Sequence, residues 1–247
     1  MTSPGNASGV ATHVAAILPA KDEAERIAAT VAAVRAIPGV DLVVVVDDGS
    51  SDATAELAAA AGAEVARHAR NRGKAAAMTT GAAYVARHEG IEGGDHPRPL
   101  LFVDGDLEGS AANLGVLVPP VLEGRADMTI ATLPPQKTAG GGHGFVVRLA
   151  RKGIEDLTGF SAVQPLSGMR CISRAAFDAA TPLARGWGVE VGLTVDVLLA
   201  GLRVEEVPCE LHHRVSGRDW RGQLHRARQY RDVALALARR RARRGLR

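Results

Sequence analysis

The sequence predicts an α/β protein whose doubly wound, mostly parallel sheet has helices on both faces. Short apolar runs, typical of buried strands, alternate five times with helical patterns over residues 13–131. This alternation is typical of a parallel sheet with right-handed crossovers. Two of the runs lead directly into acidic pairs, Asp47/Asp48 and Asp104/Asp106, and the turn at residues 19–23 after the first run carries acids more weakly. Because ligands of such sheets bind outside the carboxyl ends of the strands, we expect a polar site at that edge.

The composition argues against several classes of protein. The 247 residues carry a formal net charge of +3, are 46% hydrophobic and include only 3% aromatic residues. A small charge excess without interleaved aromatics argues against nucleic-acid binding. No apolar run reaches the roughly 18–20 residues that span a bilayer. Cys171 and Cys209 lack metal-like spacing, so we expect reduced core cysteines in a cytoplasmic protein. Residues 1–12 are small and polar and read as a disordered lead-in.

The first strand, at residues 13–18, is followed by a predicted helix at residues 23–37. Asp22 and Glu25 are three residues apart, a spacing typical of a capping box at the start of a helix. No G-x-G-x-x-G follows the strand, which argues against a dinucleotide-binding fold. No G-x-x-x-x-G-K-[ST] occurs anywhere, which argues against a phosphate-loop NTPase.

A second predicted strand, residues 42–46, leads into the polar stretch DDGSSD, and a third strand is expected at residues 64–67. A carboxylate such as Asp48 can accept a hydrogen bond from a ribose hydroxyl or a base N–H group. The alternative is a loop in which Ser51 or Asp52 caps the next helix.

The basic turn HARNRGK, residues 68–74, precedes a predicted helix at residues 75–88. Basic groups and a glycine at a helix N-terminus suit an anion, because the helix dipole and free N–H groups face it. Lys74 is therefore a candidate contact for a diphosphate. A solvated basic turn is the alternative.

The stretch LLFVDGDLEGS, residues 100–110, joins a buried strand to two aspartates, Asp104 and Asp106, with Gly105 between them. Two adjacent carboxylates need a counter-charge, and Mg²⁺ or Mn²⁺ supplies one through oxygen ligands. Asp and Gly are also ordinary turn formers, so a solvated turn is the alternative. A helix at residues 111–122 and a strand at residues 127–131 should follow.

Four blocks in this order and spacing resemble the nucleotide-sugar domain of family 2-like glycosyltransferases of the glycosyltransferase A fold: ILPAKDEAERI, VVVVDDGSSDAT, NRGKAAA and LFVDGDLEGS. The resemblance implies a nucleoside diphosphate-sugar donor with a preference for uridine, and Mg²⁺ or Mn²⁺ as the cofactor. It also implies that the donor and its metal contact Pro19, Ala20, Asp22, Glu23, Asp48, Lys74, Asp104, Gly105 and Asp106.

The blocks QPLSG and GWGVEVGL look like those of glucosyl-3-phosphoglycerate synthases and their relatives. This resemblance implies that Glu190 contacts the donor sugar, that Gly168 and Gly188 lie on the acceptor side, and that His213 joins Asp106 as a metal ligand. His212 competes with His213 for that role, and either is otherwise a surface histidine. Glu190 is alternatively a first-turn acid favoured by the helix dipole.

The loop LPPQKTAGGGHGF, residues 133–145, departs from that pattern. Phosphoglycerate-using members carry Arg and Thr here to hold the acceptor, whereas this chain has Phe145 and Val147 near those places. Its glycines suit a flexible lid over the acceptor. Arg148 is the expected substitute, with Lys137, His143 and Arg151 as alternatives.

Residues 219–247 should form a C-terminal helix that ends in ARRRARRGLR. Such a tail solvates a helix end or attracts phosphates and an anionic membrane surface. We expect the chain to have three parts after the lead-in: a nucleotide-sugar-binding half at residues 13–131, an acceptor-side half of the same domain at residues 132–218, and this basic helix at residues 219–247. A lipid-linked acceptor, a peripheral membrane contact and a homodimer remain open.

The predicted function is a metal-dependent hexosyltransferase that uses a small phosphorylated or lipid-phosphate acceptor. Asp106, Lys74 and Glu190 are the expected catalytic residues. An inverting reaction would need a carboxylate base, Glu190 or Asp156, and a retaining one would not. A sugar-1-phosphate nucleotidyltransferase is one alternative, although KDEAER is not the Gly-rich basic loop that it would need. A nucleotide-sugar-binding protein without catalysis is another.

Overall fold

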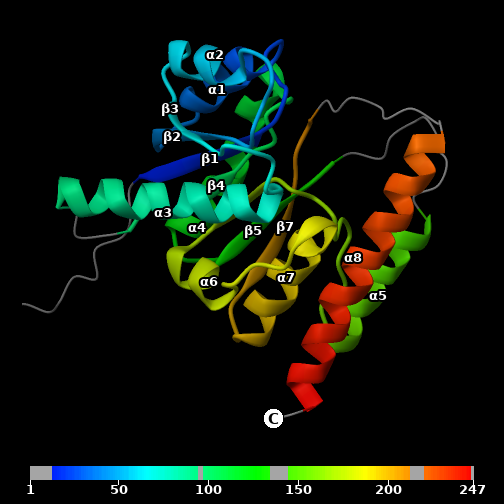
Figure 1. The fold of residues 1–247 in the computed structure, drawn as a ribbon. Helices are drawn as coiled ribbons and strands as arrows, with labels where there is room; N and C mark the ends of the chain where they lie inside the picture. The colour runs from blue at the N-terminus through cyan, green and yellow to red at the C-terminus, as the bar shows by residue number, and fades with distance from the viewer. Residues whose placement is uncertain (1–12, 94–96, 134–143, 212–219, 246–247) are drawn as a thin grey trace, which may run out of the picture.

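The computed structural model describes residues 13–93, 97–133, 144–211 and 220–245. Its strands form one seven-stranded sheet in the order β3-β2-β1-β4-β6-β5-β7 (Figure 1). The strands are β1 (Val14–Ala20), β2 (Val40–Asp47), β3 (Glu64–Arg67), β4 (Leu100–Phe102), β5 (Met128–Thr132), β6 (Arg170–Ile172) and β7 (Val204–Pro208).

The sheet is mostly parallel, as predicted, and β6 is the exception. It runs antiparallel to β4 on one side and to β5 on the other, with Arg170 paired to Phe102 and to Ile130. Because β6 runs the other way, the segment that enters it reaches the edge where β1, β2 and β4 end. Strands from both halves of the chain therefore build that edge.

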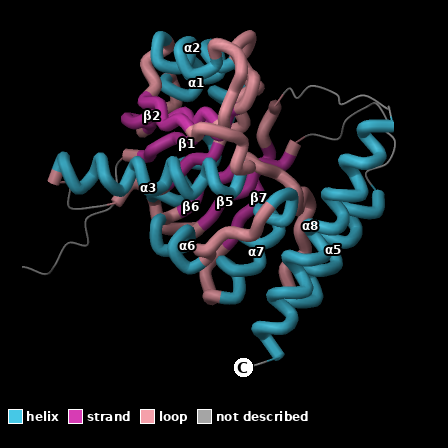
Figure 2. The backbone as a smooth tube through the Cα atoms, in the orientation of Figure 1, coloured by secondary structure: helices cyan, strands magenta, loops and turns pink. Residues whose placement is uncertain are grey.

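Helices cover both faces of the sheet (Figures 1 and 2). They are α1 (Ile27–Arg35), α2 (Thr54–Ala60), α3 (Lys74–Glu92), α4 (Val118–Leu122), α5 (Gly144–Thr158), α6 (Arg174–Ala179), α7 (Val189–Leu199) and α8 (Trp220–Gly245), with 3₁₀ helices η1 (Glu108–Leu117) and η2 (Gly186–Gly188).

Alternate residues of each buried strand point to opposite faces. In β1, Ala16 and Leu18 pack in the core formed with α1 and η1. Their neighbours Ala15 and Ile17 pack in the core formed with α3, α6 and α7. The doubly wound prediction is therefore correct.

The predicted start of the first helix is wrong. Asp22 does not cap it but has a φ of 54° and accepts a hydrogen bond from the Ser51 N–H group at 2.8 Å. The helix begins only at Ile27, and the residue at its N-cap position, Arg26, makes no capping hydrogen bond with its side chain. Asp22 and Ser51 instead join the loops after β1 and β2, a long-range pairing that spacing along the chain does not reveal.

The predicted helix at residues 111–122 is two elements. A 3₁₀ helix, η1, begins at Glu108 and is followed by the short helix α4. Prolines in the first turn of α4 lack the N–H group that a continuous α-helix would use there, so the two elements differ in hydrogen bonding.

The C-terminal helix α8 lies beside α5 (Figure 1). Val233 and Leu237 of α8 are fully buried against Ile154 of α5. The Arg240 guanidinium pairs with Asp196 of α7. Cys171 and Cys209 are free and buried, as predicted. None of the helices in the described part of the chain combines the length and the apolar character that crossing a membrane requires.

Asp48 holds the loop that leads into α3. Its carboxylate accepts hydrogen bonds from the N–H groups of Arg72 at 2.8 Å and Gly73 at 2.7 Å, and lies 2.7 Å from His68 Nδ1. His68 Nε2 in turn lies 2.9 Å from the Thr80 hydroxyl. Burial alone would raise the pKa of Asp48, and these hydrogen bonds outweigh it, so the pKa lies below its usual value.

This network predicts an acid-dependent loss of stability. Asp48→Asn should lower the free energy of unfolding at pH 7 by about 1.5–3 kcal/mol, because hydrogen bonds to a charged group are lost. The folded pKa of Asp48 is depressed, so its contribution is complete above pH ~4 and disappears as the pH falls through the folded pKa. Urea unfolding of the native chain and the variant should therefore converge below pH ~4.

The matched control is Asp178→Asn, which changes an exposed aspartate on α6. It should leave the free energy of unfolding within about 0.5 kcal/mol of the native value across the same range. A constant difference between the native chain and Asp48→Asn from pH 3 to pH 7 would contradict the assignment.

Candidate active site

The centre of the candidate site is a charged cluster of Lys74, Asp104 and Glu190. Lys74 Nζ lies 2.8 Å from Asp104 Oδ1 and 3.3 Å from Glu190 Oε1. Lys74 opens α3, Asp104 follows β4, and Glu190 lies in the first turn of α7. The fold therefore brings together three residues that the sequence analysis placed in separate motifs.

The cluster is partly removed from water. Side-chain exposure is 29% for Lys74, 31% for Asp104 and 9% for Glu190. Burial alone would lower the pKa of Lys74, but the charges and hydrogen bonds of the two carboxylates outweigh it and raise the pKa. Lys74 therefore stays an ammonium at any physiological pH.

Gly168 lies directly against this cluster. A Cβ atom at this position would collide with Lys74 Nζ and approach both carboxylate oxygens of Asp104. A side chain here would therefore displace the ammonium from its partners. Gly168 belongs to the segment that enters β6, the strand whose reversed direction brings this glycine to the site edge.

The other two predicted acceptor residues lie elsewhere. Gly188 faces α8, where a Cβ atom would meet Ala236 and the backbone of Asp232. Arg148 is exposed on α5, with its guanidinium 4.6 Å from the centre of the Phe145 ring. None of these contacts connects Gly188 or Arg148 to the charged cluster.

A second acidic corner lies beside the cluster, where β1 ends. Gly105 is buried, and a Cβ atom there would lie 3.3 Å from Ala20 Cβ and 3.6 Å from Glu23 Cγ. The pKa of Glu23 is raised by burial and by the charge of Asp106, with Arg26 opposing both. Asp106 and Glu23 are therefore close enough for their charges to repel.

The remaining predicted donor residues frame this corner. Pro19 and Ala20 are the last residues of β1, where Ala20 pairs in register with Asp47 of β2. Asp22 lies beyond them, and a hydrogen bond from Lys21 holds its pKa at about 2. The N–H group of Asp48 donates to the Ala20 carbonyl at 2.8 Å. The ends of β1 and β2 are thereby locked together.

Asp106 is the carboxylate at this corner whose oxygens are available to a hard divalent cation. Asp106 makes no hydrogen bond or ion pair with any residue in the described ranges, whereas its neighbours Glu23 and Asp104 are paired with Arg26 and Lys74. The charge of Asp106 also acts on Arg26, whose pKa it helps to raise. His213 and its competitor His212 lie outside the described residues. Among the residues that are described, no group of three or more His, Cys, Asp or Glu side chains is poised to hold a metal.

Sequence reasoning missed a buried arginine next to the site. Arg170 of β6 is 1% exposed, and its Nε and Nη1 atoms donate to the Ser167 carbonyl at 2.9 Å and the Thr194 hydroxyl at 2.8 Å. Burial lowers its pKa to about 10, against the charges of Glu190 and Glu206. The only sequence signal is an arginine inside the short apolar run MRCI.

Comparison with known proteins places the chain in a family. The profile described as "Glycosyl transferase family 2" matches residues 15–177. Glycosyltransferase AglJ of Haloferax volcanii is 28% identical over 214 residues, which cover 83% of this chain and 65% of that protein. An uncharacterized protein of Methanocaldococcus jannaschii, MJ1222, is 28% identical over 78% of each chain.

Solved structures agree with this placement. Glucosyl-3-phosphoglycerate synthase from Mycobacterium tuberculosis in complex with Mn²⁺, UDP-glucose and phosphoglyceric acid superposes with a TM-score of 0.73 at 26% identity, over 97% of this chain and 85% of that one. Its complex with Mg²⁺ and UDP has a TM-score of 0.73 at 25% identity, over 93% and 79% of the chains. This chain is a glycosyltransferase of the glycosyl transferase family 2, with the glycosyltransferase A fold.

Proposed function

We propose that this glycosyltransferase moves a hexose from a UDP-sugar to a phosphorylated acceptor in a reaction that depends on Mg²⁺ or Mn²⁺. The observation that carries the proposal is the contact of Lys74 with both Asp104 and Glu190. It sets a permanent cation between an aspartate of the predicted metal motif and the acid predicted to bind the sugar.

In this proposal each member of the cluster has a distinct role. Lys74 binds the leaving diphosphate, and its raised pKa keeps the ammonium charged throughout the reaction. Glu190 accepts hydrogen bonds from the sugar hydroxyls and orients the ring. Asp22, Glu23 and Asp48 line the nucleoside side of the site, and the Asp48 carboxylate also holds the N–H groups of Arg72 and Gly73.

Asp106 and, from the family resemblance, His213 would hold the cation, with Asp104 beside them. When bound, a divalent cation supplies positive charge to the departing diphosphate. The supporting observation is the Asp106 carboxylate, which makes no hydrogen bond or ion pair in the described ranges and whose charge acts on both Glu23 and Arg26.

The solved relatives support the choice of donor and acceptor. Glucosyl-3-phosphoglycerate synthase was captured with UDP-glucose and phosphoglyceric acid, and with Mn²⁺ or Mg²⁺. At 25–26% identity they support a uridine nucleotide and a small phosphorylated acceptor as proposals for this chain.

Asp156 is the weaker of the two candidate bases. It lies on the surface shared by α5 and α8, where it pairs with Lys152 at 3.1 Å and Arg241 at 3.4 Å. Glu190 is the carboxylate that lies in the cluster. An inverting reaction in this site would therefore use Glu190, and a retaining one would leave it to orient the sugar.

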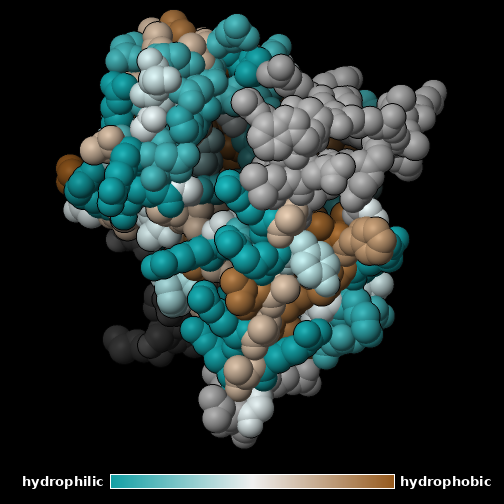
Figure 3. All heavy atoms as spheres, turned by 45° about the vertical axis from the view of Figure 1, so that its right-hand side comes forward, coloured by the Kyte–Doolittle hydropathy of each residue, from teal (hydrophilic) through white to brown (hydrophobic). Residues whose placement is uncertain are grey.

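The lipid-phosphate alternative depends on α8. This helix exposes Arg228, Arg231, Arg239, Arg241 and Arg243. Figure 3, which turns the side of α5 and α8 forward, shows apolar side chains exposed among polar ones. Such a surface suits an anionic membrane or a second copy of the chain. Cytoplasmic location, peripheral membrane contact and a homodimer stay predictions.

Asp106→Asn tests the metal site. With UDP-glucose as donor and 3-phosphoglycerate as acceptor, Mn²⁺-dependent release of UDP should fall by about a hundredfold or more, because a cation at this position stabilises transition-state charge by several kcal/mol. The melting temperature without ligands should stay near the native value. Asp178→Asn, on the exposed side of α6, is the matched control and should keep full activity. Full activity in Asp106→Asn would disprove the assignment.

Lys74→Met tests the diphosphate contact. Removal of one preorganised charged donor should lower kcat for UDP release by about two to three orders of magnitude. Lys152→Met on α5 removes an exposed ammonium and should leave kcat unchanged. Retention of kcat in Lys74→Met would show that Lys74 does not contact the diphosphate.

Nucleotide-sugar binding by the native chain without any transfer or hydrolysis would instead favour a non-catalytic binding protein.

A further inference from the structure

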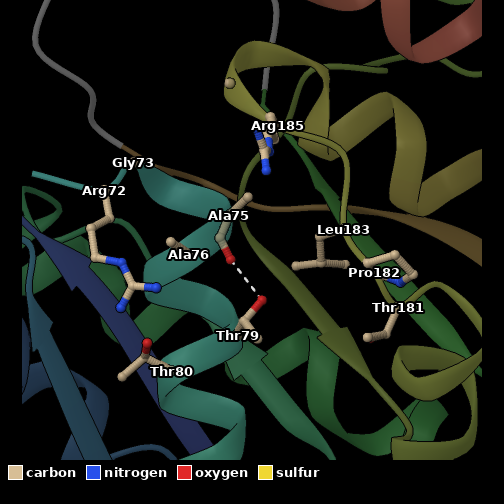
Figure 4. Close-up of a pocket in the computed structure, with 11 residues that line it drawn as sticks. Arg72, Gly73, Ala75, Ala76, Thr79, Thr80, Thr181, Pro182, Leu183 and Arg185 are labelled. Carbon is tan, nitrogen blue, oxygen red and sulfur yellow. Dashed lines mark hydrogen bonds between the residues drawn. The ribbon is translucent and has the colours of Figure 1, made fainter.

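A pocket of about 500 Å³ lies between the first half of α3 and the segment of residues 181–186 (Figure 4). Its volume is in the range of pockets that bind small molecules. Ala75 and Ala76 of α3 face Pro182 and Leu183 across it, so its walls are largely apolar.

The charge of this pocket is one-sided. Arg72 and Arg185 line it from opposite sides, and none of the described residues that line it is acidic. Neither guanidinium makes a hydrogen bond or ion pair with a residue in the described ranges, and both side chains are exposed. Arginine side chains presented in this way suit a phosphate, which they can bind through two parallel hydrogen bonds.

The pocket borders the charged cluster. Arg72 and Gly73 directly precede Lys74, and Arg185 and Gly186 lead through η2 into the first turn of α7, which carries Glu190. Figure 4 shows Arg72 and Gly73 at the start of α3 and Arg185 on the facing segment. Lys74 and Glu190 are not among the described residues that line the pocket, but Lys74 directly follows the lining residue Gly73, and Glu190 lies four residues after Gly186. A molecule in the pocket would therefore lie next to the segments that carry the cluster.

We propose that this pocket binds the phosphate monoester group of the acceptor, with Arg72 and Arg185 as its two cationic ligands. The proposal rests on the proposed glycosyl transfer and adds to it the place and charge of the acceptor. Arg148, the acceptor residue that the sequence analysis names, does not line this pocket and has its guanidinium over the Phe145 ring of α5. The apolar wall beside Leu183 would contact the carbon skeleton of the acceptor.

The test measures binding of phosphate monoesters to the full chain by isothermal titration calorimetry in the presence of UDP and Mn²⁺. The probes are inorganic phosphate, 3-phosphoglycerate and a short polyprenyl phosphate in detergent. At least one probe should bind the native chain, and its dissociation constant should rise about tenfold in Arg72→Ala and in Arg185→Ala. Tighter binding of 3-phosphoglycerate or of the polyprenyl phosphate identifies a soluble or a lipid-linked acceptor.

The matched control is Arg87→Ala, which removes an exposed arginine further along α3 whose guanidinium lies over the Tyr84 ring. It should leave every dissociation constant unchanged. The affinity for UDP and Mn²⁺ should stay within twofold of the native value in all three variants.

Three results would overturn the proposal. They are failure of all three probes to bind the native chain, equal affinity of the native chain and both pocket variants, and a loss of UDP affinity in those variants. The last result would assign the arginines to the donor. Failure of the proposed function is distinguishable, because the native chain would then release no UDP from UDP-glucose in the presence of Mn²⁺, whatever its affinity for phosphate monoesters.

Discussion

One ammonium group connects the elements of the candidate site. Lys74 lies within 3.3 Å of both Asp104 and Glu190, and so ties the start of α3 to the end of β4 and the start of α7. Carboxylates that are partly removed from water are costly unless they are paired. Asp104 and Glu190 share this ammonium, and the buried Arg170 guanidinium lies close enough to Glu190 for their charges to interact. This ionic network holds the three elements together around the proposed donor site.

Two distant parts of the chain fix the position of this ammonium. Asp48 holds the backbone of Arg72 and Gly73, and so sets where α3 begins. On the other side, Gly188 packs on Ala236 of α8, and Arg240 of α8 pairs with Asp196 of α7. The basic C-terminal helix therefore supports the element that carries Glu190, whatever else its exposed arginines contact.

Much of this could be predicted from sequence, and the limits have physical causes. Strand ends such as Asp48 and Asp104 follow apolar runs, so their shared edge follows from parallel pairing. Asp22 was misread as a cap because its partner, Ser51, lies 29 residues away. Arg170 was missed because an isolated arginine in an apolar run gives no hint that a reversed strand buries it beside Glu190. In both cases the position of the side chain depends on tertiary contacts that the local sequence does not reveal.

The most direct test of the site is a thermal-shift measurement on the native chain with UDP-, GDP- and ADP-glucose, each with Mn²⁺, Mg²⁺ or EDTA. A ligand that binds only the folded state raises the melting temperature. At a ligand concentration one hundred times its dissociation constant, the folded state is stabilised by about 2.7 kcal/mol. We predict a shift with the UDP-sugar that requires Mn²⁺ or Mg²⁺ and disappears with EDTA. Absence of any shift with all three sugars, or an equal shift in EDTA, would contradict a metal-dependent donor site around Lys74, Asp104 and Asp106.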